Sequence, residues 1–366
     1  MFKYIKNLIL RLALMGSSKT LTTAVALAVV AGLAHGDVRL QGAGATFPNP
    51  LYQKWVSEYQ KQHPDVKIDY QSIGSGGGVK AITDKTVDFA GSDAPLTKKQ
   101  IEALGGKAVQ IPTTAGAVVL AYNLPNFNGE LTLSGEAIAD IFQGKITRWN
   151  DAKLAKLQPA GVTLPDAAIT PAWRTDGSGT SFVFTNYLAT QSESFRETIG
   201  KGSQVKWPVG TGGKGNDGVA AIVRSTPGTI GYVELNYATM NKIPFATVIN
   251  KDGKPVKASP KTVSAAGAGA VSAMKPDSLA VPIWNQSGDD AYPISALTYL
   301  IVYNDLGNVK SPEQAKALAG FLAWATSTDG GQPLCESLDY APLAPAVAEK
   351  AQAAIKALTY NGAATN

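Results

Sequence analysis

Apolar positions along this chain alternate between helical and strand spacing. Residues 51–63 (LYQKWVSEYQKQH) place apolar side chains on one face of a helix, whereas residues 65–73 (DVKIDYQSI) alternate as a strand does. Two longer runs, residues 115–124 (AGAVVLAYNL) and 292–304 (YPISALTYLIVYN), are apolar and rich in β-branched residues, as buried strands are. This succession of patterns predicts an α/β fold.

Helix starts are visible in the polar residues that precede the helical patterns. Asn49 followed by Pro50 predicts an N-cap and a first helical residue. Residues 97–100 (TKKQ) and 311–314 (SPEQ) both have the spacing of a capping box, in which two side chains satisfy backbone N–H groups reciprocally. We therefore expect helices to begin at these three places.

The first 36 residues have the pattern of a cleaved secretory signal. They hold four basic and no acidic residues, and an apolar stretch runs from Leu21 to Ala34. That stretch is short for a membrane span. Cleavage before Asp37 leaves 330 of the 366 residues, and Met15 offers a second possible start. We therefore expect a secreted protein.

Removing this segment changes the charge of the chain. Of the 33 Lys and Arg residues, 29 remain against 28 Asp and Glu, and no basic stripe is left, so nucleic-acid binding is not expected. Cys335 is the only cysteine, which excludes an intrachain disulfide. A length of 330 residues suggests two domains.

Three segments rich in glycine and hydroxyl residues precede helical patterns. They are residues 42–50 (GAGATFPNP), 74–78 (GSGGG) and 174–182 (RTDGSGTSF). The first turn of a helix has unpaired N–H groups and a partial positive charge, so an anion is stabilised there. The guanidinium of Arg174 can add a planar fork for two oxygens. Together these segments predict a socket for a tetrahedral oxyanion.

Several enzyme mechanisms lack the residues that they need. After signal cleavage His63 is the only histidine, and its neighbour Pro64 indicates an exposed turn, which argues against a Ser-His-Asp triad and against zinc. Residues 177–181 (GSGTS) do not form a nucleophile elbow, and residues 210–215 (GTGGKG) lack the spacing of a phosphate-binding loop. We interpret residues 210–215 as a tight turn, and we expect no catalytic residue, no metal ligand and no cofactor.

The ordered set of motifs resembles the periplasmic phosphate-binding proteins of bacterial high-affinity phosphate ABC importers, the PstS family. The resemblance runs from Gly42 to Leu343. Its motifs are GAGATFPNPLY, SIGSGGGVKAI, DFAGSDAPLT, RTDGSGTSFVFTNYL, VKWPVGTGGKGNDGVAAIV, GTIGYVELNYA and SLDYAPL. It implies a type II periplasmic binding protein, in which two α/β lobes are joined by crossover hinge strands and the ligand cleft lies between them. We assign residues 37–120 and 295–366 to lobe I and residues 121–294 to lobe II.

The resemblance also implies a set of phosphate-binding residues. Asp93 matches an acceptor carboxylate, and Arg174 matches a guanidinium that pairs with Asp176. In this sequence Gly76 stands where many relatives carry a serine. The implied ligand-binding residues are Thr46, Phe47, Ser75, Asp93, Arg174, Asp176, Ser178, Gly179 and Thr180.

Phosphate carries a proton at neutral pH and sulfate does not, so a carboxylate at Asp93 would favour phosphate by repelling a fully ionised guest. The resemblance thus implies a monomeric solute-binding protein, not an enzyme. It would capture inorganic phosphate and deliver it to the permease subunits of an ABC importer, with the ATPase subunit behind them. Two alternatives remain open: a secreted phosphatase-like protein and a binding protein for another oxyanion.

Overall fold

The computed structural model describes residues 37–275 and 278–365, so the predicted signal segment and the alternative start at Met15 lie outside the described residues. The described residues from Arg39 onward cluster into a single compact unit. The strands are β1 (Val38–Gly44), β2 (Val66–Ser72), β3 (Phe89–Ser92), β4 (Ala108–Tyr122), β5 (Thr132–Leu133), β6 (Thr170–Arg174), β7 (Thr211–Gly213), β8 (Thr229–Glu234), β9 (Thr247–Ile249), β10 (Pro255–Val256), β11 (Ser295–Tyr303), β12 (Thr359–Tyr360) and β13 (Ala363–Ala364).

Helices alternate with these strands along the chain, as the apolar patterns predict. They are α3 (Asn49–Gln62), α4 (Ser75–Thr83), α5 (Lys98–Ala103), α6 (Gly135–Phe142), α7 (Ala152–Ala155), α8 (Gly179–Gln191), α9 (Glu193–Thr198), α10 (Gly215–Ser225), α11 (Leu235–Met240), α12 (Pro260–Gly267), α13 (Ala270–Ala273), α14 (Pro312–Ala325) and α15 (Pro345–Lys356), with short 3-10 turns at Gln332–Leu334 and Glu336–Leu338. None of the helices in residues 37–275 and 278–365 combines the length and apolar character needed to cross a bilayer.

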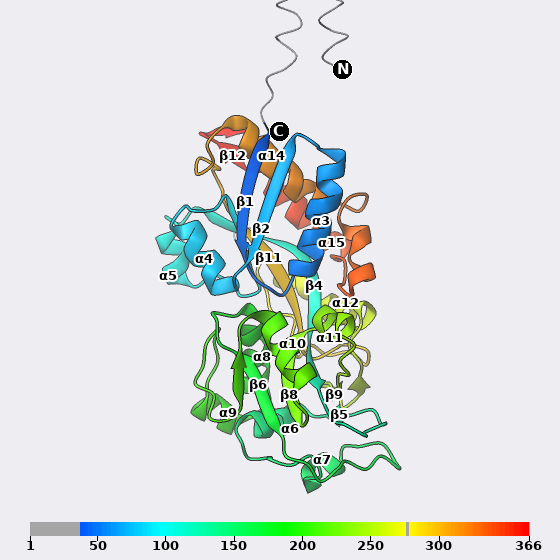
Figure 1. The fold of residues 1–366 in the computed structure, drawn as a ribbon. Coiled ribbons are helices and arrows are strands. Elements are labelled where there is room, and N and C mark those ends of the chain that lie inside the picture. Colours follow the sequence, from blue (N-terminus) through cyan, green and yellow to red (C-terminus); the bar gives the residue numbers. More distant parts are fainter. Residues whose placement is uncertain (1–36, 276–277, 366) are drawn as a thin grey trace, which may run out of the picture. The chain divides into compact units, whose positions relative to one another are not determined.

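Two long strands lie at the centre of the main sheet, whose order is β2-β1-β3-β11-β4-β8-β6-β7. β11 and β4 pair antiparallel from Ser295↔Ala117 to Tyr303↔Ala108, and they lie side by side in Figure 1. From Val118 onward β4 pairs with β8 instead. One strand therefore belongs to both halves of the sheet, as a crossover strand must. The predicted architecture of two α/β lobes joined by such strands is confirmed.

The helix α3 shows how the apolar pattern produces packing. Leu51, Tyr52 and Trp55 are all buried, which is the outcome that helical spacing of apolar residues predicts. The start of the helix differs by one residue from the prediction. Pro48 is the N-cap, and Asn49, already the first helical residue, has Oδ1 accepting from Nε2 of Gln53 at 3.1 Å.

The two predicted capping boxes have different outcomes. At α5 the box is complete, because Thr97 and Gln100 each accept the other's backbone N–H. At α14 only the first half forms: Ser311 accepts from the N–H of Gln314. The Gln314 side chain accepts from the N–H of Lys310, so the prediction of a full box is wrong there. The competing partner is one residue earlier in the chain, which spacing alone does not reveal.

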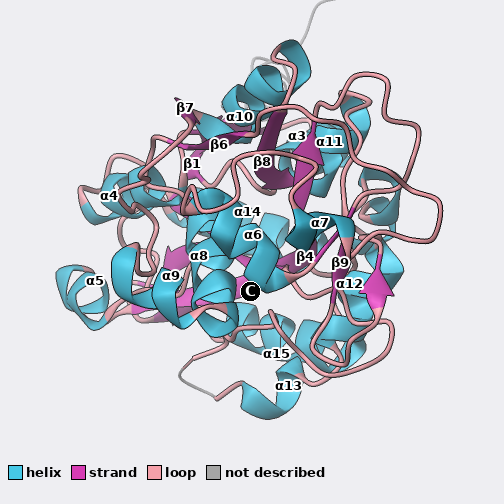
Figure 2. Ribbon diagram, turned by 90° about the horizontal axis from the view of Figure 1, so that it is seen from below, coloured by secondary structure: helices cyan, strands magenta, loops and turns pink. Residues whose placement is uncertain are grey.

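The core consists of the central strands and the helices packed around them (Figure 2). Every residue of β8 is buried, and β4 is buried from Ile111 to Tyr122. Cys335 is also buried, and its Sγ accepts from Oγ1 of Thr114 at 3.6 Å. Burial raises the pKa of this thiol to about 12. Cys335 is therefore a packing residue with little thiolate at neutral pH.

Candidate functional site

The predicted site residues follow the carboxyl ends of strands. Thr46 comes two residues after β1, Asp93 directly after β3, and Arg174 is the last residue of β6. β1 and β3 are parallel, so their carboxyl ends meet at the same edge of the sheet. In open α/β sheets ligands bind at this edge, because the loops there and the N-termini of the following helices converge.

The starts of α4 and α8 are in direct contact. Oγ of Ser75, the first residue of α4, accepts the N–H of Gly179, the first residue of α8, at 3.1 Å. The same oxygen accepts the N–H of Asp93 at 3.3 Å and lies 3.3 Å from Oδ2 of Asp93, to which it can donate. Two positive helix ends and one carboxyl group therefore lie together, although the residues are far apart in the sequence.

Glycine makes this close approach possible at two places. Gly74, the N-cap of α4, has a φ of 87°, and a Cβ there would lie 2.3 Å from Oδ2 of Asp176. Gly76 donates its N–H to the carbonyl of Gly177 at 2.9 Å. A Cβ on Gly76 would lie 3.2 Å from Cα of Gly177, so a side chain at Gly76 would press the two segments apart. Gly76 therefore fits the tight spacing seen here.

The guanidinium of Arg174 is buried and held in a fixed orientation. Its Nε and Nη2 donate to the two carboxylate oxygens of Asp176 at 2.8 and 2.5 Å, and its Nη1 donates to Oγ1 of Thr180 at 3.2 Å. Asp176 also accepts the N–H of Gly215. Burial by itself raises the pKa of Asp176, but the hydrogen bonds and charge of Arg174 outweigh it and lower that pKa. The predicted pairing of Arg174 with Asp176 is present.

Asp93 has the most unusual electrostatic environment of the predicted residues. Burial raises the pKa of its carboxyl to about 7, although a hydrogen bond from Thr298, the charge of Arg174 and a hydrogen bond from Ser75 act in the opposite direction. Oγ1 of Thr298 donates to Oδ1 at 2.7 Å. Oδ1 is thus held by β11 and Oδ2 by Ser75 of α4. Oδ2 also faces the start of α8, where a Cβ on Gly179 would lie 2.4 Å away.

Thr46 and Phe47 lie in the loop that leads from β1 to α3. Both are buried. Oγ1 of Thr46 accepts from the side chain of Asn216 at 2.7 Å. The carbonyl of Phe47 accepts from the hydroxyl of Tyr340 at 2.6 Å, and the two rings meet edge to face. The C-terminal motif SLDYAPL therefore supports this loop through Tyr340.

Ser178 has a capping role in the structure. It is the N-cap of α8, and its Oγ accepts the N–H of Ser181 at 2.9 Å. An N-cap that accepts in this way keeps its hydroxyl hydrogen for another acceptor. Ser178 thus joins the other predicted residues at the helix start, and the structure brings all nine of them to one region of the fold.

Sequence reasoning missed three residues that hold this region together. Asn216 contacts Thr46 and Thr180, Thr298 contacts Asp93, and the hydroxyl of Tyr232 accepts the N–H of Arg174 at 3.1 Å. Asn216 lies in the resemblance motif GTGGKGNDG. The interpretation of residues 210–215 as only a tight turn is wrong, because Thr211–Gly213 form the edge strand β7, parallel to β6. That strand places the start of α10 beside Thr46.

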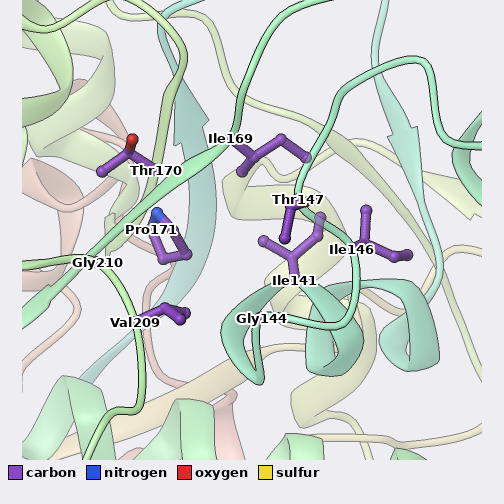
Figure 3. A pocket seen from close by; sticks show the side chains of 9 residues that line it. All are labelled: Ile141, Gly144, Ile146, Thr147, Ile169, Thr170, Pro171, Val209 and Gly210. Atoms are coloured by element: carbon purple, nitrogen blue, oxygen red, sulfur yellow. The ribbon is translucent and has the colours of Figure 1, made fainter.

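A separate cavity of about 120 Å³ lies elsewhere on β6 (Figure 3). Its walls are mainly apolar, and none of the predicted site residues lines it. The lining residues are Ile141, Gly144, Ile146, Thr147, Ile169, Thr170, Pro171, Val209 and Gly210. It offers no charged side chain for an anion, so the hydrogen-bonded cluster around Arg174 and Asp93 is the better candidate site.

Comparison with known proteins first identifies the class of protein to which the fold belongs. Residues 29–329 match the PBP superfamily domain. The fold is also similar to two solved structures: a phosphate-binding protein from Stenotrophomonas maltophilia (TM-score 0.64) and a high-affinity periplasmic phosphate-binding protein, PfluDING, bound with phosphate (TM-score 0.68). Each is 21% identical and covers 86% of this chain and 93% of the other. The fold is that of a two-lobed periplasmic binding protein.

Curated relatives then narrow the class to a family. Phosphate-binding protein PstS of Pasteurella multocida is 44% identical over 317 residues, which are 86% of this chain and 89% of the relative. Phosphate-binding protein PstS of Xylella fastidiosa (strain 9a5c) is 40% identical over 318 residues, covering 87% of this chain and 85% of the relative. The chain belongs to the PstS family of phosphate-binding proteins, and the resemblance found in the sequence is confirmed.

Proposed function

We propose that this protein captures inorganic phosphate and delivers it to a phosphate ABC importer. The observation that carries the proposal is the burial of Arg174 and Asp93 beside the contacting starts of α4 and α8. The cation and the helix ends stabilise an anion, and the carboxyl, when ionised, accepts a proton that the anion brings. Membership of the PstS family supports the same ligand.

The predicted residues divide the ligand contacts between them. Three of the N–H groups of Arg174 donate to Asp176 and Thr180. A guanidinium has five N–H donors, so two are left for the ligand. Backbone N–H groups at the helix starts and the hydroxyls add further donors. The phosphate contacts that we propose come from Thr46, Phe47, Ser75, Asp93, Arg174, Ser178, Gly179 and Thr180, with Asp176 orienting Arg174.

Asp93 is the selective element of the proposed site. A phosphate proton is donated to its carboxylate, which gives a charge-assisted hydrogen bond. Sulfate brings no proton, so its oxygens face a like charge in a buried site. The same argument disfavours molybdate and tungstate, and it separates phosphate from the alternative oxyanions.

We further propose that residues 37–120 and 295–366 form lobe I and residues 121–294 form lobe II. The change of partner along β4, from β11 at Ala117 to β8 at Val118, supports a boundary close to residue 120. Thr46, Ser75 and Asp93 then belong to lobe I, and Arg174 and Thr180 to lobe II. Phosphate would be enclosed by a hinge motion about β4 and β11.

The cellular setting is part of the proposal. A cleaved signal at residues 1–36 would place the protein in the periplasm, where a monomer passes phosphate to the permease subunits, with the ATPase subunit behind them. We propose a binding protein and not an enzyme. Among the described residues no group of three or more His, Cys, Asp or Glu side chains is arranged to hold a metal. His63 is exposed and stacks on Tyr59.

Isothermal titration of ligand-stripped protein with phosphate, sulfate and molybdate tests the proposal. We expect tight binding of one phosphate, with sulfate and molybdate ineffective in large excess. A sulfate affinity within about tenfold of phosphate, a difference of about 1.4 kcal/mol, would contradict the role of Asp93. Absence of phosphate binding would contradict the proposed function itself.

A further inference from the structure

Asn216 joins the two sides of the candidate site through one buried side chain. It is the second residue of α10 and is fully buried. Its Nδ2 donates to Oγ1 of Thr46 at 2.7 Å and to Oγ1 of Thr180 at 3.1 Å. Its Oδ1 accepts the backbone N–H of Glu234 at 2.9 Å. These contacts reach the loop after β1, the first turn of α8 and the end of β8.

The backbone of Glu234 fixes which end of the amide faces the threonines. A backbone N–H can only donate, so the atom of Asn216 that faces it must be the oxygen. The NH2 group therefore faces Thr46 and Thr180. Both threonine hydroxyls must accept from it.

The acceptor capacity of both hydroxyls is then full. A hydroxyl oxygen has two lone pairs and one hydrogen to donate. Oγ1 of Thr46 accepts from Nδ2 and also from the backbone N–H of Asn216 at 3.3 Å. Oγ1 of Thr180 accepts from Asn216 and from Nη1 of Arg174. Because all four partners are donors only, each threonine is left with its O–H as the one group to offer.

We infer that Asn216 is a positioning residue that fixes Thr46 and Thr180 as hydrogen-bond donors toward a bound oxyanion. The inference rests on the proposed function, because it concerns how that site recognises its ligand. The ionised oxygens of phosphate accept hydrogen bonds, and hydroxyls that are already oriented as donors lose no alternative bond when the ligand arrives. Asn216 also links Thr46 of lobe I to lobe II, so its contact with Thr46 forms only when the lobes are close.

The alternative is that Asn216 only anchors the start of α10 to β8. A double-mutant cycle separates the two roles. We expect Asn216→Ala to weaken phosphate binding by about tenfold, the value of one well-made hydrogen bond. In protein that carries Thr46→Val and Thr180→Val, where no hydroxyl remains to be oriented, Asn216→Ala should change the affinity by less than about threefold.

Asn216→Asp provides a second variant of nearly identical shape. Its carboxylate can still accept from Glu234 but cannot donate, so the two hydroxyls would turn toward it. We expect a loss of affinity of about a hundredfold at about pH 8, which shrinks at lower pH as the introduced carboxyl gains a proton. Gln204→Glu is the matched charge control. Gln204 is exposed and donates to the carbonyl of Thr175, not to Thr46 or Thr180, so this variant should show a small and pH-independent change.

Titration calorimetry with inorganic phosphate gives each affinity, and circular dichroism and thermal unfolding confirm the fold of each variant. A similar effect of Asn216→Ala with and without the threonine hydroxyls would overturn the inference and leave the proposed function intact. Equal phosphate affinities of Asn216→Asp and Gln204→Glu, at about pH 8 and again at the lower pH, would also overturn the inference. Failure of the wild-type protein to bind phosphate would overturn the proposed function, and the inference with it.

Discussion

Oγ of Ser75 accepts the backbone N–H of Gly179 at 3.1 Å, which brings together the first residues of two helices that are 104 positions apart in the chain. The contact leaves little free space. A Cβ on Gly179 would lie 2.4 Å from both Ser75 Oγ and Asp93 Oδ2. The start of α8 therefore depends on glycine for its distance to Asp93.

Gly179→Ala is expected to weaken phosphate binding and to lower the free energy of unfolding by roughly 1–3 kcal/mol, because a methyl group must displace buried polar atoms. The matched control is Gly269→Ala, since nothing lies within 4 Å of a Cβ at Gly269. Calorimetric binding and thermal unfolding measure both effects. Wild-type behaviour of Gly179→Ala would show that the two helix starts can separate without cost.

Arg174→Ala should weaken phosphate binding by roughly 2–5 kcal/mol, because it removes a buried cation and leaves Asp176 unpaired. Arg174→Lys should recover only part of the loss, since an ammonium cannot reproduce the bidentate pair with Asp176. Calorimetric titration measures both variants. Wild-type affinity in Arg174→Ala would place this side chain outside the ligand site.

Asp93→Asn should keep more phosphate affinity than Asp93→Leu, because an amide oxygen still accepts the proton of the ligand and leucine does not. The Asn variant also lacks the charge that repels sulfate, and its NH2 group can donate. The affinity for sulfate relative to phosphate should therefore increase in Asp93→Asn. Competition titrations at one pH and ionic strength give the ratio of the two dissociation constants, and an unchanged ratio in Asp93→Asn would assign selectivity to other residues.

The raised pKa of Asp93 predicts a pH dependence of stability in the ligand-free protein. The carboxyl titrates near its ordinary value of 3.8 when unfolded and at about 7 in the fold. Between these values the folded state holds a proton that the unfolded state has lost. The free energy of unfolding should therefore fall as pH rises from about 4 to about 7, by at most roughly 4 kcal/mol from this group.

Urea unfolding of wild type and Asp93→Asn across that range measures this contribution, because the variant retains all other titrating groups. The stability of wild type relative to the variant should decrease up to about pH 7 and then stay constant. A constant difference over the whole range would show that Asp93 titrates at its ordinary pKa.

Phosphate should close the two proposed lobes, since each holds only part of the site. Small-angle scattering of stripped and phosphate-loaded protein is expected to show a smaller radius of gyration in the loaded state. The fluorescence of Trp173, which adjoins Arg174 and donates from Nε1 to the carbonyl of Val209 at 3.0 Å, should change in the same titration. Scattering curves that coincide would indicate a preformed site and would contradict the hinge.

The sequence by itself determined the local features of this protein. Helical and strand spacing predicted α3 and β2, and a complete capping box predicted the start of α5. The glycine-rich segment at residues 74–78 predicted a helix behind it, whereas α4 already begins at Ser75. These features depend on residues a few positions apart, whose spacing is fixed by the geometry of one element. The order of such motifs along the chain was also sufficient to identify the family.

Tertiary structure decided which distant groups face one another. Asn216 contacts Thr46 from 170 positions away, and Thr298 holds Asp93 from 205 positions away. No periodicity connects such pairs, because their distance is set by sheet order and strand register. The pKa of Asp93 could not be predicted from the sequence either, because it depends on how completely the folded chain removes water from this carboxyl group.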